Sequence, residues 1–93
     1  MARYKLIIAY DGTSYSGWQI QPNGISIQET IQHALSLVLS GEKAVLIGSG
    51  RTDAGVHALG QTAHFQTEKM LDLGRLVFSL NGILPPAIRI KRA

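Results

Sequence analysis

The strongest constraint on the fold is a helical segment in the first half of the chain, between short β-like runs. Ser26 is a good helix N-cap, and Glu29 three residues later completes a capping box. The apolar residues that follow recur at helical spacing, at Ile27, Ile31, Ala34, Leu35, Val38 and Leu39. Gly41 stands where a C-terminal glycine belongs. The chain therefore contains one amphipathic helix that needs an apolar partner surface.

The segments around this helix predict strands. Residues 4–10 (YKLIIAY) place Tyr4, Leu6, Ile8 and Tyr10 on one face of a first strand. Residues 44–47 (AVLI) are a short continuous apolar run, which predicts a buried second strand. Residues 61–67 alternate, and predict a third strand with Ala63 and Phe65 on one face and Thr62, His64 and Gln66 on the other.

The last third of the chain predicts a second helix and a final strand. Asp72 can cap a helix whose apolar stripe is Leu73, Leu76, Val77 and Leu80. The pattern ends near 81–82, and Pro85 and Pro86 follow it. Beyond them, apolar and basic residues alternate in a last strand, at Ile88, Arg89, Ile90 and Lys91.

The resulting order, β-α-β-β-α-β, predicts an α+β ferredoxin-like fold over residues 1–93. Right-handed crossovers give an antiparallel sheet in the order 4-1-3-2, with both helices on one face. In this topology the loop after strand one and the loop between strands two and three emerge at the same end of the sheet. We therefore expect one group of residues, Asp11, Tyr15, Trp18 and Gln19, to lie near another, Arg51, Asp53 and His57.

Composition excludes several classes of protein. The 93 residues contain no cysteine, which excludes disulfide frameworks, cysteine-zinc sites, iron-sulfur clusters and thiol nucleophiles. Apolar residues make up 45% of the chain, but no apolar run is long enough for a membrane span and no signal segment begins it, so we expect a cytoplasmic globular domain. The net charge of +3 is compatible with a polyanionic partner such as RNA.

The most unusual segment is 48–65, GSGRTDAGVHALGQTAHF. A dinucleotide fingerprint would need glycine at Asp53, and a phosphate-binding P-loop would need Lys and Ser or Thr at Val56 and His57, so both phosphate-binding interpretations fail. A metal site from Asp53, His57 and His64 follows no helix or hairpin spacing. Two interpretations remain from the residues alone: an Asx-type turn, or Asp53 as a reactive carboxylate whose ionised form the nearby Arg51 favours.

RNA recognition modules share the same order of elements, and a plain binding domain is a further alternative. Such modules place aromatic residues at fixed positions of the third strand, where bases stack on them. Here that strand is QTAHFQT, which has one aromatic residue and lacks the usual signature.

The segment GSGRTDAGVHALGQTAHF closely resembles the active-site motif of the tRNA pseudouridine synthase A family. The opening segments YDGTSYSGWQIQP and SIQETIQHAL resemble the same family, so the likeness covers nearly the whole chain. It implies an isomerase that converts uridine to pseudouridine in the anticodon arm of tRNA, without cofactor or metal. The family's essential aspartate falls on Asp53, and Arg51 is the candidate for base extrusion. Thr52 and His57 are supporting hydrogen-bonding residues, and Gly55 is a backbone necessity.

The resemblance also sets expectations about the whole protein. Family enzymes are over twice this length, have two related halves and act as homodimers. The chain is thus expected to be the N-terminal catalytic-aspartate domain of a longer protein, inactive alone because the family's uracil-stacking tyrosine lies in the second half. The alternatives are a stand-alone RNA-binding module that kept the motif without the chemistry, and a structural or dimerisation domain.

Overall fold

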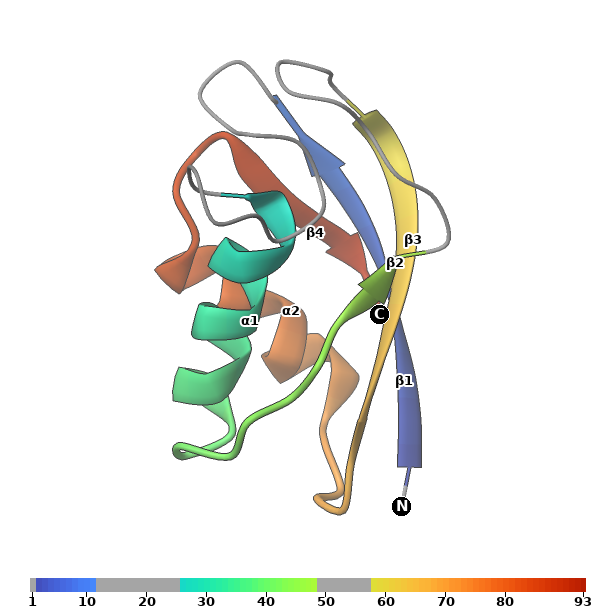
Figure 1. The fold of residues 1–93 in the computed structure, drawn as a ribbon, viewed down its shortest axis with the longest axis vertical. Coiled ribbons are helices and arrows are strands. Elements are labelled where there is room, and N and C mark those ends of the chain that lie inside the picture. The colour runs from blue at the N-terminus through green and yellow to red at the C-terminus, as the bar shows by residue number, and fades with distance from the viewer. Residues whose placement is uncertain (1, 12–25, 49–57) are drawn as a thin grey trace.

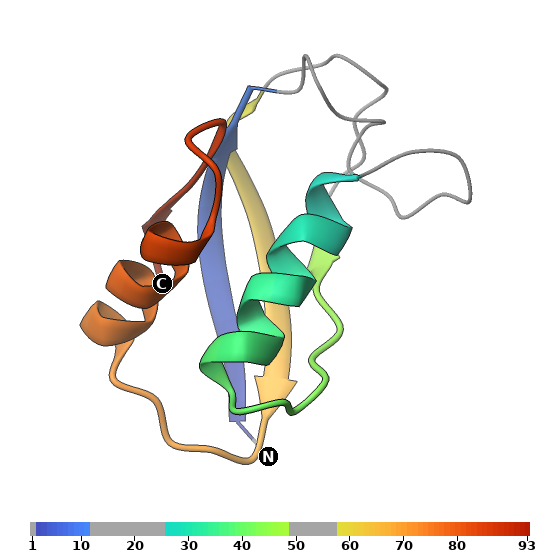
Figure 2. The same ribbon diagram turned by 90° about the vertical axis from the view of Figure 1, so that its left-hand side faces the viewer.

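The computed structural model describes residues 2–11, 26–48 and 58–93, which form six elements. Along the chain these are β1 (Ala2–Tyr10), α1 (Ile27–Val38), β2 (Ile47–Gly48), β3 (Ala58–Thr67), α2 (Leu73–Ile83) and β4 (Ile88–Arg92). The strands form one antiparallel sheet in the order β2-β3-β1-β4, and both helices cover the same face (Figures 1 and 2). The predicted fold class, strand order and helix placement are confirmed.

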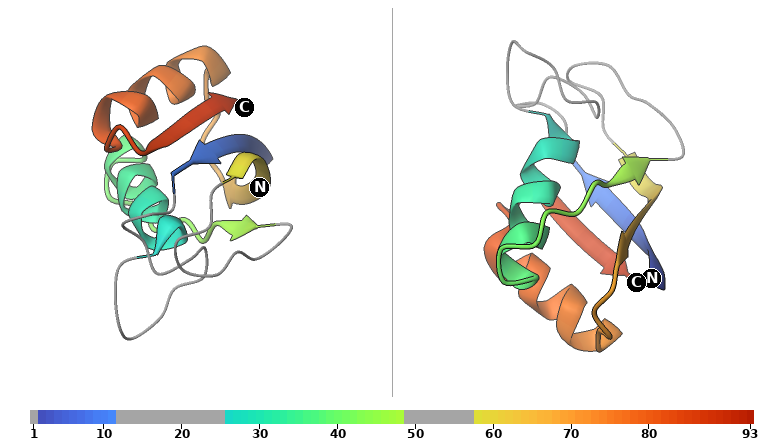
Figure 3. Two further views of the ribbon diagram at one scale, coloured as in Figure 1. Left: turned by 90° about the horizontal axis from the view of Figure 1, so that it is seen from above. Right: turned by 60° about the horizontal axis from the view of Figure 1, so that its bottom comes forward.

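The core lies between the sheet and the two helices, as the view from above shows (Figure 3). Every second residue of the strands points into it, and the buried strand residues include Leu6, Ile8, Tyr10, Ala63, Phe65, Ile88 and Ile90. The helices contribute their apolar stripes, with Ile27, Ile31, Ala34, Leu35, Leu76 and Leu80 all buried. Neither α1 nor α2 covers the other face of the sheet, which we call the open face.

Both helices begin at the predicted caps. The Ser26 hydroxyl accepts a hydrogen bond from the Glu29 N–H at 3.1 Å, and the Asp72 carboxylate accepts one from the Arg75 N–H at 3.1 Å. After α1 the chain turns with positive φ angles at Ser40 (59°) and Gly41 (91°), and the Gly41 N–H donates to the Ser36 carbonyl. This conformation explains the glycine predicted at the helix end.

The second strand is shorter than predicted. Only Ile47 and Gly48 pair with β3, and burial alternates along the run: Ala44 and Leu46 are buried, whereas Val45 and Ile47 are exposed. The prediction of a buried strand over residues 44–47 was therefore wrong. Its cause is a competing set of hydrogen bonds, because the backbone of Leu46 bonds to side chains of α1 rather than to a strand.

The other boundaries differ by a few residues. β1 and β3 begin earlier than predicted, at Ala2 and Ala58, because the two strands pair with each other over almost their full length. Leu73 belongs to the predicted stripe of α2 but is 44% exposed, so the buried stripe of that helix begins at Leu76.

Candidate functional site

The described ends of the two long connecting segments meet at one end of the sheet. Tyr10, the last residue of β1, pairs with Ala58, the first residue of β3. The end of β1 therefore lies beside the start of β3 (Figure 1). Asp11, the last described residue before the first segment, donates its backbone N–H to the Ala87 carbonyl at 2.8 Å. The fold thus brings together the ends of the two most unusual stretches of the sequence, as the topology predicts.

The predicted site residues themselves lie outside the described residues. This applies to the proposed catalytic Asp53, to Arg51, and to the supporting Thr52, Gly55 and His57. It applies equally to Tyr15, Trp18 and Gln19. Their roles remain predictions, and the structure describes only the framework from which their segments start.

Two glutamines of α1 bind the backbone of Leu46, the residue directly before β2. The side-chain amide of Gln28 donates to the Leu46 carbonyl at 2.6 Å, and the Leu46 N–H donates to Gln32 Oε1 at 2.9 Å. Gln28 and Gln32 are one helical turn apart, so they lie side by side on α1. One residue later, Ile47 pairs with His64 of β3. α1 and β3 together therefore set the position at which the chain enters the predicted active-site segment.

The aromatic residues of the strands belong to the core. Phe65, the one aromatic residue of the third strand, is 1% exposed and stacks on Tyr4 with ring centroids 5.5 Å apart. The Tyr4 hydroxyl donates to the Lys69 carbonyl and accepts from the Leu71 N–H. Base-stacking modules need such rings on the open face of the sheet. Among the described strand side chains no Phe, Tyr or Trp ring is exposed, so this alternative lacks the rings that such modules place there.

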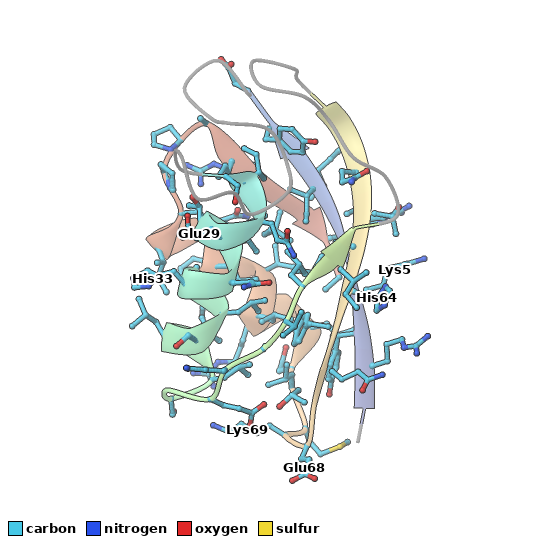
Figure 4. The ribbon with its side chains drawn as sticks, in the orientation of Figure 1. Lys5, Glu29, His33, His64, Glu68 and Lys69 are labelled. Carbon is cyan, nitrogen blue, oxygen red and sulfur yellow. The ribbon has the colours of Figure 1, made fainter. Side chains whose placement is uncertain are left out.

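The open face instead carries polar, basic and aliphatic side chains. Lys5 of β1 lies opposite His64 of β3, and Ile47 of β2 lies on the other side of His64. Figure 4 shows Lys5 and His64 on the side of the sheet away from the helices. A hollow on this face is lined by Arg3, Val45, Ile47, His64, Phe65 and Gln66. Sequence reasoning placed His64 on this face but missed the basic pair Arg3 and Lys5, although their alternation with Tyr4 and Leu6 indicates it.

The described residues form neither a metal-binding cluster nor a membrane-spanning helix. Within the described ranges, no three His, Asp or Glu side chains are grouped so that they could hold a metal ion. His64, the described member of the metal-ligand set considered from the sequence, lies between Lys5 and Ile47. No helix formed by residues 2–11, 26–48 or 58–93 has the length and apolar character of a membrane span.

Comparison with known proteins identifies the family. The family described as tRNA pseudouridine synthase matches residues 6–93. The chain is 68% identical over 88 residues to tRNA pseudouridine synthase A 1 of Protochlamydia amoebophila, covering 95% of the chain and 34% of that protein. It is 56% identical over 93 residues to tRNA pseudouridine synthase A of Geotalea uraniireducens, covering all of the chain and 38% of that protein.

A third relative shows similar identity and similar coverage of both chains. tRNA pseudouridine synthase A of Bacteroides thetaiotaomicron is 53% identical over 92 residues, covering 99% of the chain and 34% of that protein. The chain therefore spans little more than a third of the length of these relatives. With residues 6–93 matched, the chain belongs to the tRNA pseudouridine synthase family.

Proposed function

We propose that the full-length protein containing this chain is a tRNA pseudouridine synthase, which isomerises uridine to pseudouridine in the anticodon arm of tRNA. The observation that carries the proposal is the family match over residues 6–93, which includes the motif RTDAGVHA. Because the chain spans about a third of its relatives, we assign the activity to the longer protein. The chain is its N-terminal catalytic-aspartate domain, and the protein is a cytoplasmic homodimer.

The proposed reaction exchanges one bond for another at the ribose. The bond from C1′ of the ribose to N1 of the uracil breaks, the base turns, and its C5 carbon bonds to C1′. The hydrogen on C5 leaves as a proton and the freed N1 takes up a proton, so the product is an isomer of the substrate and no oxidant or reductant is consumed. Asp53 supplies the carboxylate at the reacting nucleotide, and the resemblance assigns the reaction no metal or cofactor.

A stacked nucleotide must leave the stem or loop before a side chain can reach its glycosidic bond, at a cost of a few kcal/mol. We assign this extrusion to Arg51, because a guanidinium can pair with a carboxylate or a phosphate and can stack on bases. Thr52 and His57 supply supporting hydrogen bonds, and Gly55 lets the backbone approach the nucleotide closely.

Two features of the described residues support this assignment. The paired ends at Tyr10 and Ala58 hold the start of one motif segment beside the end of the other. The inward orientation of Phe65 disfavours a stand-alone module that reads stacked bases on its sheet. The alternative of a structural or dimerisation domain predicts self-association without RNA binding.

Release of tritium from tRNA labelled at uridine C5 tests the proposal, because forming the new bond expels that hydrogen. We expect release by the full-length protein, none by its Asp53→Asn variant, and none by the 93-residue chain alone. Asp53→Asn keeps nearly the same shape and removes the charge, so it separates chemistry from folding. Undiminished release by Asp53→Asn would contradict the role of Asp53, and release by the isolated chain would show that a third of the protein holds a complete site.

A further inference from the structure

Positive charge is concentrated on the strands of the sheet. The four strands contain five of the nine Arg and Lys residues of the chain and none of its six Asp and Glu residues. These five basic residues, all exposed, are Arg3, Lys5, Arg89, Lys91 and Arg92. The carboxylates of Glu29 and Asp72 belong to the first turn of α1 and the N-cap of α2. The sheet is therefore the basic layer of the domain.

Within this layer, Arg3 and Lys5 are the basic residues of β1, and both lie on the open face. They are two residues apart on β1, about 7 Å along the strand, and so point to the same side. Arg3 lies opposite Gln66, and Lys5 lies opposite His64. Neither makes a side-chain hydrogen bond or ion pair with any residue in the described ranges. By contrast, Arg89 donates to the Asn81 carbonyl of α2 and is turned toward the helix layer.

The neighbours of these two cations suit a polyanion. His64 and Gln66 add polar groups in the same cross-strand rows, and Val45 and Ile47, 66% and 52% exposed, border the hollow on the β2 side. Because the rings of Tyr4 and Phe65 pack in the core, no described Phe, Tyr or Trp ring lies on this surface for bases to stack on. Lys and Arg side chains contact phosphate oxygens, and such contacts position a nucleic acid without reading its sequence.

We propose that the open face around Arg3, Lys5 and His64 binds the phosphate backbone of the RNA substrate. The inference rests on the proposed function, since it names the surface that holds the substrate away from the reacting nucleotide. Lys5 is five residues before Tyr10, so the surface lies about 17 Å from the end of β1 at which the two motif segments meet. A stem that enters the active site can contact both places, and the remote contacts contribute binding energy without taking part in the chemistry.

The test compares two double variants that remove the same charge, one from the open face and one from outside the strands. Arg3→Gln/Lys5→Gln changes the open face, and the matched control Lys43→Gln/Arg75→Gln removes two exposed cations outside the strands. Both are made in the full-length protein carrying Asp53→Asn, so that binding is measured without turnover. The probe is an unmodified tRNA transcript, and the observable is the binding constant over a range of salt concentrations.

We expect the open-face variant to bind roughly tenfold more weakly and to reduce the slope of log K against log salt by about 2, one for each lost phosphate contact. The control variant should stay within about twofold of the parent. Equal losses in the two variants, or no loss in either, would overturn the proposal. The tritium assay is independent because it uses the full-length protein with Asp53 intact. An open-face effect on binding together with no tritium release by that protein would refute the proposed function and leave the RNA surface standing.

Discussion

At the scale of single residues, one buried hydroxyl ties three parts of the chain together. Thr67 at the end of β3 is 1% exposed, and its hydroxyl donates to the Glu42 carboxylate at 2.6 Å. The same oxygen accepts the Lys69 N–H at 3.2 Å, and the Lys69 ammonium donates to the Leu39 carbonyl at the end of α1. The turn after β3 is thereby connected to the turn after α1.

Thr67→Val should lower the free energy of unfolding by about 1–3 kcal/mol. Valine has the same shape but no hydroxyl. The substitution therefore removes the hydrogen bond to the Glu42 carboxylate and the one from the Lys69 N–H, and it leaves the carboxylate without this donor. Urea unfolding monitored by circular dichroism measures the change. Thr62→Val is the control, because Thr62 lies on the open face opposite Ile7 and should change stability by no more than about 0.5 kcal/mol. Equal effects of the two substitutions would show that the hydroxyl of Thr67 contributes nothing.

At the scale of elements, side-chain amides of the helices form hydrogen bonds with the backbone at both edges of the sheet. Gln28 and Gln32 of α1 bind the carbonyl and N–H of Leu46 next to β2. Asn81 of α2 does the same for Ile90 of β4, donating to its carbonyl at 3.0 Å and accepting its N–H at 2.8 Å. Edge strands present unpaired backbone groups. At these two points the helices satisfy them.

Gln28→Ala/Gln32→Ala should lower the free energy of unfolding, because it removes both hydrogen bonds to the backbone of Leu46. Leu46 is fully buried, so its peptide groups would lose their partners away from water, at about 1–3 kcal/mol for each unsatisfied group. Hydrogen exchange read by NMR should show the Leu46 amide exchanging much faster than in the parent chain. Gln66→Ala removes an exposed glutamine from the open face and should leave this exchange unchanged. A Leu46 amide that stays protected in the double variant would contradict the role of the glutamines.

These amide contacts mark the limit of prediction from sequence. Periodicity and caps found both helices, because Ser26 and Asp72 act on residues three positions away. Periodicity failed at residues 44–47, because the hydrogen-bond partners of Leu46 are 14 and 18 residues away in the sequence. No local sequence pattern predicts such distant partners. The motif around Asp53 could be recognised from its residues alone. The row of Ile47, His64 and Lys5 became visible only with the pairing of the strands.

At the scale of the whole molecule, the chain is compact, but α2 exposes a large apolar side chain. Its radius of gyration of 12.2 Å matches the value of about 12 Å expected for a packed domain of this length. On α2, however, Phe78 is 80% exposed beside a groove lined by Gly74, Val77, Phe78, Asn81, Gly82 and Arg89. Exposed apolar surface of this kind promotes association when nothing covers it.

We therefore expect Phe78→Ser to reduce self-association of the isolated chain without destabilising it. The ring contributes little to the core, so its loss should change the free energy of unfolding by about 0.5 kcal/mol or less. Sedimentation velocity at increasing protein concentration measures the association. Leu37→Ser is the matched control, because Leu37 is a 56% exposed apolar residue of α1, on the other helix. If both substitutions reduce association equally, general surface hydrophobicity is responsible, and if neither does, the α2 face is inert in the isolated chain.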